Sequence, residues 1–396
     1  MKIGRLKIID SCNIYILLWV LWTLQGLFFD SVFFARSFYI PFVVLTLYYV
    51  AKVLMAYQPR GVMSAFSLLF IFLLPYGIGL LLFDDVPLVS RTSFLKALFN
   101  SMGPVFAFYV FTKRGLLTEK RMRIWLLVFI AVAIASFYVN QQLRMEFHGE
   151  RYKYDEVTNN AAYPILSLMP FVFVLKKKPI LLLLLMGIVV FFVVIGYKRG
   201  AILISLFMIL WTIYIFTQSA KRGRRILVLL VTIIFLIYGG KFIVHKYNSS
   251  DYFQYRVELT IEGDANNREW MFSELWDHYS SNQSFSQLLL GEGAYETVNI
   301  TEGHKAHNDW LELLVDCGLL GFIVYFVYWI FFLRDLRRKR YNETVYAMMG
   351  ACFIFTFMRT LFSISYADIP FYMTVILGYC FATPNELELK ENNSGE

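Results

Sequence analysis

One histidine stands where a polar stretch of the chain turns into an apolar one, and its ring could accept a proton at neutral pH. His307 comes directly before Asn308 and the run Asp309-Trp310-Leu311 that opens the apolar stretch. An imidazole has an unperturbed pKa of about 6.5, so it can take the proton of an attacking hydroxyl. His307 is therefore the candidate general base, with a merely solvated loop histidine as the alternative.

The residues after His307 predict the helix that must position it. Asp309 and Glu312 have the spacing of a capping box, so we expect them to start this helix. Gly318 and Gly321 follow, and such small residues are expected to allow close helix packing. His307 is thus expected at the membrane surface, at a defined helix start.

Arginines supply the positive charge that could stabilise an anionic leaving group without a metal. Arg199 lies in a short turn between two apolar runs, where snorkelling to lipid headgroups is the alternative explanation. Arg359 lies inside an apolar run, where a cation costs about 2.5–3.5 kcal/mol on insertion scales. It should therefore face a cavity, an ionic partner or an anionic ligand, and either substrate binding or a structural ion pair would satisfy it.

Arg268 is expected in the first turn of an amphipathic helix. The apolar residues that mark this helix recur at i, i+3, i+4 and i+7, namely Phe272, Leu275, Trp276 and Tyr279. Asn266, three residues before Glu269, would cap it. Free N–H groups and the helix dipole then favour an anion beside Arg268. A helix lying on the membrane, with Arg268 on lipid headgroups, is the alternative.

The elements that carry these residues read as membrane-spanning helices. The 396-residue chain is 58% hydrophobic and 17% charged, against about 45–50% and about 25% in soluble domains. It predicts an all-α polytopic membrane protein, a single membrane domain over residues 1–396, and argues against a soluble globular protein. Twelve apolar runs are the expected spans, near 13–29, 37–57, 64–83, 94–112, 124–139, 161–175, 179–197, 200–217, 225–244, 310–333, 343–362 and 370–382.

Basic residues set the expected topology. They cluster in every even-numbered connection, so by the positive-inside rule these connections and both termini face the cytoplasm. Residues 245–309 then form a large extracytoplasmic loop between the ninth and tenth spans. The polar tail, residues 385–396, is expected to be disordered and cytoplasmic. Because the net charge of +8 resides in these short clusters, it does not indicate a nucleic-acid partner.

Signatures of cofactor-dependent enzymes are missing from the sequence. It contains no phosphate-binding loop of the G-x-x-x-x-G-K-[ST] type and no D-x-D pair, so neither a nucleotide nor a metal cofactor is expected. The four cysteines lie far apart in or beside apolar runs, and they predict neither a disulfide framework nor a metal site.

Four short motifs lie between residues 190 and 330. They are Lys198-Arg199-Gly200, Asn267-Arg268 with Trp270, Leu290-Gly291-Glu292-Gly293, and His307-Asn308 running on to Gly318 and Gly321. Together they resemble the bacterial O-antigen ligase and polymerase superfamily, whose large periplasmic loop closes with a histidine-asparagine pair entering a span.

This resemblance implies a glycosyltransferase of the bacterial cytoplasmic (inner) membrane, with its active site facing the periplasm or the cell exterior. The donor would be a glycan on undecaprenyl pyrophosphate, bound by Arg199 and Arg268. His307 would activate the acceptor hydroxyl for inverting attack, and Asn308 would orient His307 or the substrate. Arg359 matches no motif, and its binding role is predicted from position alone.

Three functions remain open from the sequence. A polymerase of O-antigen, capsule or exopolysaccharide would transfer the growing chain to another lipid-linked repeat unit. A ligase would transfer the finished glycan to a lipid A core, as in lipopolysaccharide, or to a protein. A transporter or flippase of lipid-linked glycan would perform no chemistry. The lipid bilayer, the donor and the acceptor are the expected partners, together with a chain-length regulator and a flippase.

Overall fold

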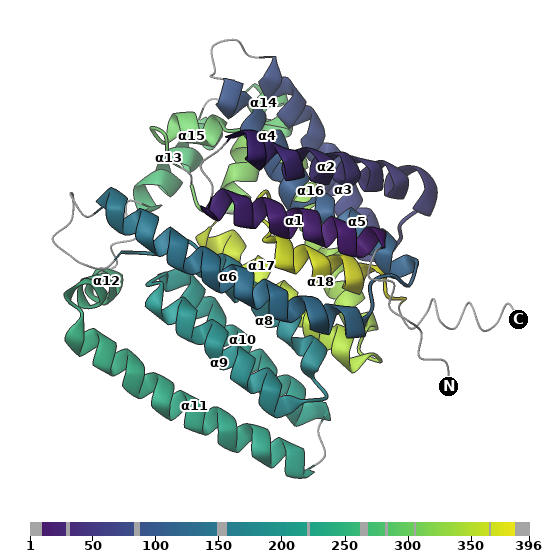
Figure 1. Cartoon of the computed structure of the whole chain (residues 1–396). Helices are drawn as coiled ribbons and strands as arrows, with labels where there is room; N and C mark the ends of the chain where they lie inside the picture. The colour runs from purple at the N-terminus through teal and green to yellow at the C-terminus, as the bar shows by residue number, and fades with distance from the viewer. Residues whose placement is uncertain are drawn as a thin grey trace, which may run out of the picture.

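The computed structural model shows the chain as an assembly of helices (Figure 1). It describes residues 10–28, 32–82, 88–148, 157–219, 222–261, 268–281, 284–304, 306–363 and 366–384, and these form only helices, turns and irregular segments. The helices are α1 (Ser11–Phe28), α2 (Val32–Lys52), η1 (Val53–Tyr57), α3 (Gly61–Leu81), α4 (Leu88–Ser101), α5 (Gly103–Lys113), α6 (Glu119–His148), α7 (Ala162–Leu166), α8 (Leu168–Val172), η2 (Phe173–Leu175), α9 (Pro179–Ile195), α10 (Arg199–Ser219), α11 (Arg222–Ser249), α12 (Asp251–Ile261), α13 (Arg268–Ser281), α14 (Phe285–Leu290), α15 (Glu296–Ile300), α16 (Asp309–Arg338), α17 (Glu343–Phe362) and α18 (Phe371–Ala382).

Eight helical segments in the described part of the chain are long and apolar enough to cross a membrane, so the protein is an all-α polytopic membrane protein. Four further apolar runs expected to span fall on α11, on the shorter helices α9 and α18, and on the broken helix of residues 162–175. The eight segments are Ser11–Phe28, Ser37–Tyr57, Gly61–Leu81, Arg91–Lys113, Glu119–Glu146, Arg199–Gln218, Asp309–Arg338 and Glu343–Leu361.

An aromatic layer joins α18 to the first helices of the chain. Phe371, the first residue of α18, stacks on Trp19 with 4.0 Å between ring centroids, and its ring also meets Phe108 of α5 at 5.5 Å. On α1, the Tyr15 hydroxyl lies 2.7 Å from Thr46 Oγ1 of α2, so this buried phenol has a hydrogen-bond partner. The start of α18 is therefore fixed by packing, and with it the connection from α17.

Basic connections that the charge pattern assigns to one side of the membrane meet at one end of the helical body. Arg121, at the start of α6, forms a 2.7 Å ion pair with Asp10, which precedes α1. Lys176, after η2, forms a 2.7 Å ion pair with Glu343 at the start of α17. The predicted alternation put these connections on the same side, and their contacts agree with it.

The long loop predicted between the ninth and tenth spans is largely helical. Helix α11 continues to Ser249, and α12 to α15 follow before α16 begins. In Figure 1, α12 and α13 lie near the left ends of the long helices α6 and α11. The expected Asn266 cap and the tail 385–396 fall outside the described residues.

Helix α16 is broken at Gly318, and the loop after α14 fits into the break. Gly318 has φ 64° and ψ −168°, a combination essentially restricted to glycine. A Cβ on Gly318 would lie 2.5 Å from Gly291 N, and a Cβ on Gly291 would lie 2.4 Å from the Asp316 carbonyl. The expectation that Gly318 allows close packing of two helices is confirmed, because Leu289 at the end of α14 (Phe285–Leu290) lies against it together with Gly291.

Hydrogen bonds from this loop replace those that the break removes. Glu292 N and Gly293 N donate to the carbonyl oxygens of Val315 and Asp316 at 3.1 and 3.0 Å. The buried Asp316 carboxylate accepts from Tyr295 N at 3.0 Å and from the next helix, α15, at 2.9 Å. Irregular backbone at membrane depth requires such internal partners. The first two turns of α16, which follow His307, are thus fixed to the loop.

Candidate active site

His307 lies at the helix start that the sequence predicts, in an unusual backbone conformation. Its φ is 55°, in the left-handed region, and its side chain is partly exposed between the buried Ala306 and the cap of α16. Few residues other than glycine adopt this region, although histidine and asparagine do so more often than most. The turn directs the chain from the loop into α16, and it keeps the imidazole at the surface of the helical body.

Asn308 caps α16, which corrects the expectation that Asp309 and Glu312 do so. The Asn308 Oδ1 atom accepts hydrogen bonds from Trp310 N at 3.0 Å and Leu311 N at 3.2 Å. Asp309 is the first helical residue, and its carboxylate turns inward. The capping-box spacing misled because an asparagine one residue earlier also satisfies the free N–H groups. In the structure the Asn308 amide oxygen is engaged by the helix.

Asp309 ties the start of α16 to the connection between α17 and α18. Its buried Oδ2 accepts from the Tyr325 hydroxyl at 2.8 Å and from Tyr366 N at 3.1 Å. Because Asp309 lies two residues after His307, these bonds also fix the backbone that carries the imidazole. The carboxylate therefore positions the candidate base.

Replacement of Asp309 with Ala is expected to lower the free energy of unfolding by about 2–4 kcal/mol, because two buried donors lose their acceptor. Thermal unfolding of the purified protein in detergent would measure this loss. The matched control is Asp251→Ala, which removes an exposed carboxylate at the start of α12 and should shift stability by about 0.5 kcal/mol at most. Equal stability of the two variants would contradict the positioning role of Asp309.

Arg268 is the first residue of α13, as the amphipathic pattern predicts. Leu275 of this helix packs with Ala306 and Val315 in a small buried cluster, so α13 lies against the segment that contains His307. The inner face differs from the predicted one, because Met271 and Leu275 are buried whereas Trp276 is 54% exposed. The buried face is the one that packs on Ala306 and on Val315 of α16.

Arg359 packs on the aromatic ring of Tyr163 in α7. The Arg359 guanidinium lies over the Tyr163 ring, with its central carbon 5.1 Å from the ring centroid. The structure thus places one of the three predicted cations, Arg359, against Tyr163.

Arg359 is buried, and it forms the ion pair that the sequence offered as one explanation for a cation in a span. One terminal nitrogen donates to the backbone oxygen of Asp368 and the other to its Oδ2, both at 2.7 Å. The Arg359 side chain is 2% exposed, whereas that of Asp368 is 71% exposed. Direct contact of Arg359 with a substrate stays a prediction.

Arg199 is the first residue of α10 and is half-buried. Tyr197, just before it, is in the left-handed region with φ 51°, and its ring meets Phe253 of α12 at 5.4 Å. Helix α10 also packs against α7, which carries Tyr163. Arg199 therefore lies at the start of a helix that packs against the helix of Tyr163.

Contacts among the described residues link the candidate base to the cations by two routes. Helix α13 joins Arg268 to His307 through packing, and the Asp309–Tyr366 hydrogen bond joins His307 to the segment that binds Arg359. Sequence reasoning missed Asp309 as a positioning residue, and it missed Asp368. Asp368 could have been noticed in the sequence, because it is an acidic residue shortly after the span that contains Arg359.

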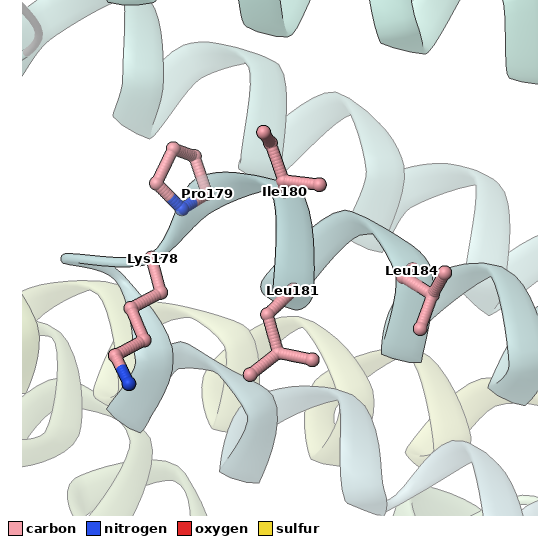
Figure 2. Close-up of a pocket in the computed structure, with 5 residues that line it drawn as sticks. All are labelled: Lys178, Pro179, Ile180, Leu181 and Leu184. Atoms are coloured by element: carbon pink, nitrogen blue, oxygen red, sulfur yellow. The ribbon is translucent and has the colours of Figure 1, made fainter.

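A pocket of about 390 Å³ lies elsewhere, at the start of α9 (Figure 2). The segment that lines this pocket begins two residues after Lys176, which pairs with Glu343 at the basic end of the helical body. Since its lining is apolar apart from one lysine, it offers no group for the chemistry considered above. The lining residues are Lys178, Pro179, Ile180, Leu181 and Leu184.

Comparison with known proteins adds no relative to these observations. No protein-family model matches the chain, and no curated protein matches its sequence. The resemblance to the O-antigen ligase and polymerase superfamily therefore rests on the four motifs.

Proposed function

We propose that the chain is a membrane-embedded glycosyltransferase that lengthens a polysaccharide. It would transfer a glycan from undecaprenyl pyrophosphate to a hydroxyl of another lipid-linked repeat unit, at the outer face of the bacterial cytoplasmic membrane. The proposal includes twelve spans with cytoplasmic termini. The observation that supports it best is the packing of α13, which begins at Arg268, against the segment that contains His307.

In the proposed reaction His307 removes the proton of the acceptor hydroxyl, and the oxygen of that hydroxyl attacks the anomeric carbon of the donor. The bond from that carbon to the pyrophosphate oxygen breaks, and the configuration inverts. Arg199 and Arg268 neutralise the negative charge that develops on the leaving diphosphate, which is the role that a metal fills in many transferases. Pyrophosphate is a good leaving group, so no nucleotide is required.

Arg268 is the residue that tests the donor side of this proposal. Its replacement with Ala should raise the apparent KM for the lipid-linked donor by about 10- to 100-fold, because a charged hydrogen bond contributes about 1.5–3 kcal/mol. Arg268→Lys should recover part of the loss, since it keeps the charge but not the planar fork. Donor dependence of transfer by purified protein would measure both variants.

A matched control is Lys246→Ala, which removes a cation from the last turn of α11. It should leave the apparent KM within about twofold of the wild-type value. If Arg268→Ala and Lys246→Ala have the same donor dependence, Arg268 does not bind the pyrophosphate.

Deletion of the gene in the native host distinguishes polymerase from ligase. For a polymerase, membranes should accumulate single repeat units on undecaprenyl pyrophosphate, because each unit is made but not joined to the next. Extraction of lipid-linked intermediates followed by mass spectrometry would detect them. Accumulation of long, undelivered chains would instead favour the ligase.

A further inference from the structure

The connection between α17 and α18 presents one carboxylate that is both exposed and rigidly placed. Asp368 has a 71% exposed side chain, although the residues around it are anchored. Exposed acidic side chains usually move freely and gain little from binding, because fixing them costs conformational entropy. Asp368 differs because its position is already fixed.

Three consecutive residues of this connection are held by three different parts of the structure. Tyr366 N donates to Asp309 at the start of α16 at 3.1 Å, and the Ala367 oxygen accepts from Ser101 at the end of α4 at 3.1 Å. The Asp368 oxygen and carboxylate both accept from Arg359 of α17 at 2.7 Å. The backbone and one carboxylate oxygen of Asp368 are therefore preorganised, which reduces the cost of binding a ligand.

The charge of Asp368 indicates which substrate it would meet. A carboxylate repels a diphosphate, so Asp368 does not belong to the part of the site that binds the donor pyrophosphate. Carboxylates accept short, charge-assisted hydrogen bonds from hydroxyl groups. The buried Arg359 orients the carboxylate, in the way that an outer partner orients a binding residue.

Asp368 is also connected to the candidate base through two hydrogen-bonded segments. The Tyr366–Asp309 hydrogen bond joins the connection between α17 and α18 to the start of α16. Asp368 lies two residues after Tyr366, and His307 lies two residues before Asp309. The hydroxyl that loses its proton to His307 belongs to the acceptor. A group that binds the acceptor sugar must therefore lie close to His307.

We infer that Asp368, held by Arg359, binds hydroxyl groups of the acceptor glycan and so selects the acceptor. This inference rests on the proposed transferase function. It gives Arg359 a positioning role, and it separates an acceptor side at Asp368 from a donor side at Arg199 and Arg268.

The test compares wild-type protein and Asp368→Asn, full-length and in lipid nanodiscs, with two probes. The acceptor probe is the free glycan released by mild acid from lipid-linked intermediates of the native host. The donor-side probe is undecaprenyl pyrophosphate. Asn keeps an oxygen for Arg359 but removes the negative charge, so the variant should bind the free glycan about tenfold more weakly or worse. Binding of undecaprenyl pyrophosphate should change less than about threefold.

Two further variants keep the result interpretable. Asp368→Glu restores the charge and should recover part of the glycan affinity, which a purely structural role would not produce. Asp251→Asn, a change in another exposed carboxylate, should bind both probes as the wild type does. Thermal unfolding of each variant verifies that it is folded.

Three outcomes would overturn the inference. If wild-type protein transfers glycan but Asp368→Asn binds the free glycan normally, the acceptor site lies elsewhere and the transferase proposal stands. If Asp368→Asn instead loses undecaprenyl pyrophosphate binding, the residue belongs to the donor side. If wild-type protein transfers no glycan at all, the proposed function fails and the acceptor site fails with it.

Discussion

Replacement of His307 with Asn should reduce glycan transfer by about 10²- to 10⁴-fold, the contribution typical of a positioned general base. Asn is the preferred replacement because asparagine, like histidine, adopts the left-handed backbone found at φ 55° more readily than Ala does. His307→Ala should abolish transfer as well. Rates measured with saturating donor and acceptor would test the catalytic step itself.

The matched control is His304→Ala, which removes an exposed histidine three residues earlier in the same loop. This variant should transfer glycan at the wild-type rate. The wild type, His307→Asn and His304→Ala should insert into membranes in equal amounts. Transfer by His307→Asn within about threefold of the wild type would exclude His307 as the base.

Replacement of Gly318 with Ala should prevent accumulation of folded protein. Its backbone conformation alone costs a residue with a Cβ about 1–3 kcal/mol. The added Cβ would also lie 2.5 Å from backbone atoms of Gly291 and Leu289, which cannot move aside as a side chain can. The expected loss of stability is on the order of 3 kcal/mol or more, a large part of a typical folding free energy.

Gly79→Ala provides the control for this experiment. Gly79 lies in α3, and an added Cβ would meet nothing within 4 Å. Ala should be tolerated there, because it favours helices over Gly by about 1 kcal/mol. Protein yield in membranes and thermal unfolding would compare the two variants. A Gly318→Ala protein as abundant and stable as Gly79→Ala would show that the break in α16 does not depend on glycine.

The positions of the long apolar helices could be predicted from the sequence because each of them follows from a local property. A run of apolar residues must form its backbone hydrogen bonds internally in lipid, so hydropathy alone marks it as helical. The 28-residue helix α11 and the long helix α6 both lie where such runs predict them. The amphipathic repeat likewise predicted α13, which begins at Arg268.

The break in α16 could not be predicted in this way. Apolar residues lie on both sides of Gly318, and hydropathy therefore predicts one continuous helix there. The break depends on contact with Gly291, a residue 27 positions earlier in the chain. The buried face of α13 was misjudged for the same reason, since Leu275 packs against Ala306, which no local pattern indicates.

For the candidate site, motifs found the residues but not their partners. His307 and Arg268 stood out because histidine and arginine at helix starts suggest chemistry. Asp368 did not, since a single acidic residue in a connection is usually solvated. Its role depends on Arg359, nine residues earlier, and on the anchoring of Tyr366 by Asp309. Only the folded chain brings these groups together.

The most direct test of the proposed chemistry uses purified protein in liposomes that contain undecaprenyl-pyrophosphate-linked repeat units from the native host. The assay contains no nucleotide, and a chelator removes divalent metal ions. The account predicts longer glycans on the lipid carrier, with one undecaprenyl pyrophosphate released for each glycosidic bond formed. Movement of the lipid-linked glycan across the bilayer, without any new glycosidic bond, would contradict it and identify a transporter.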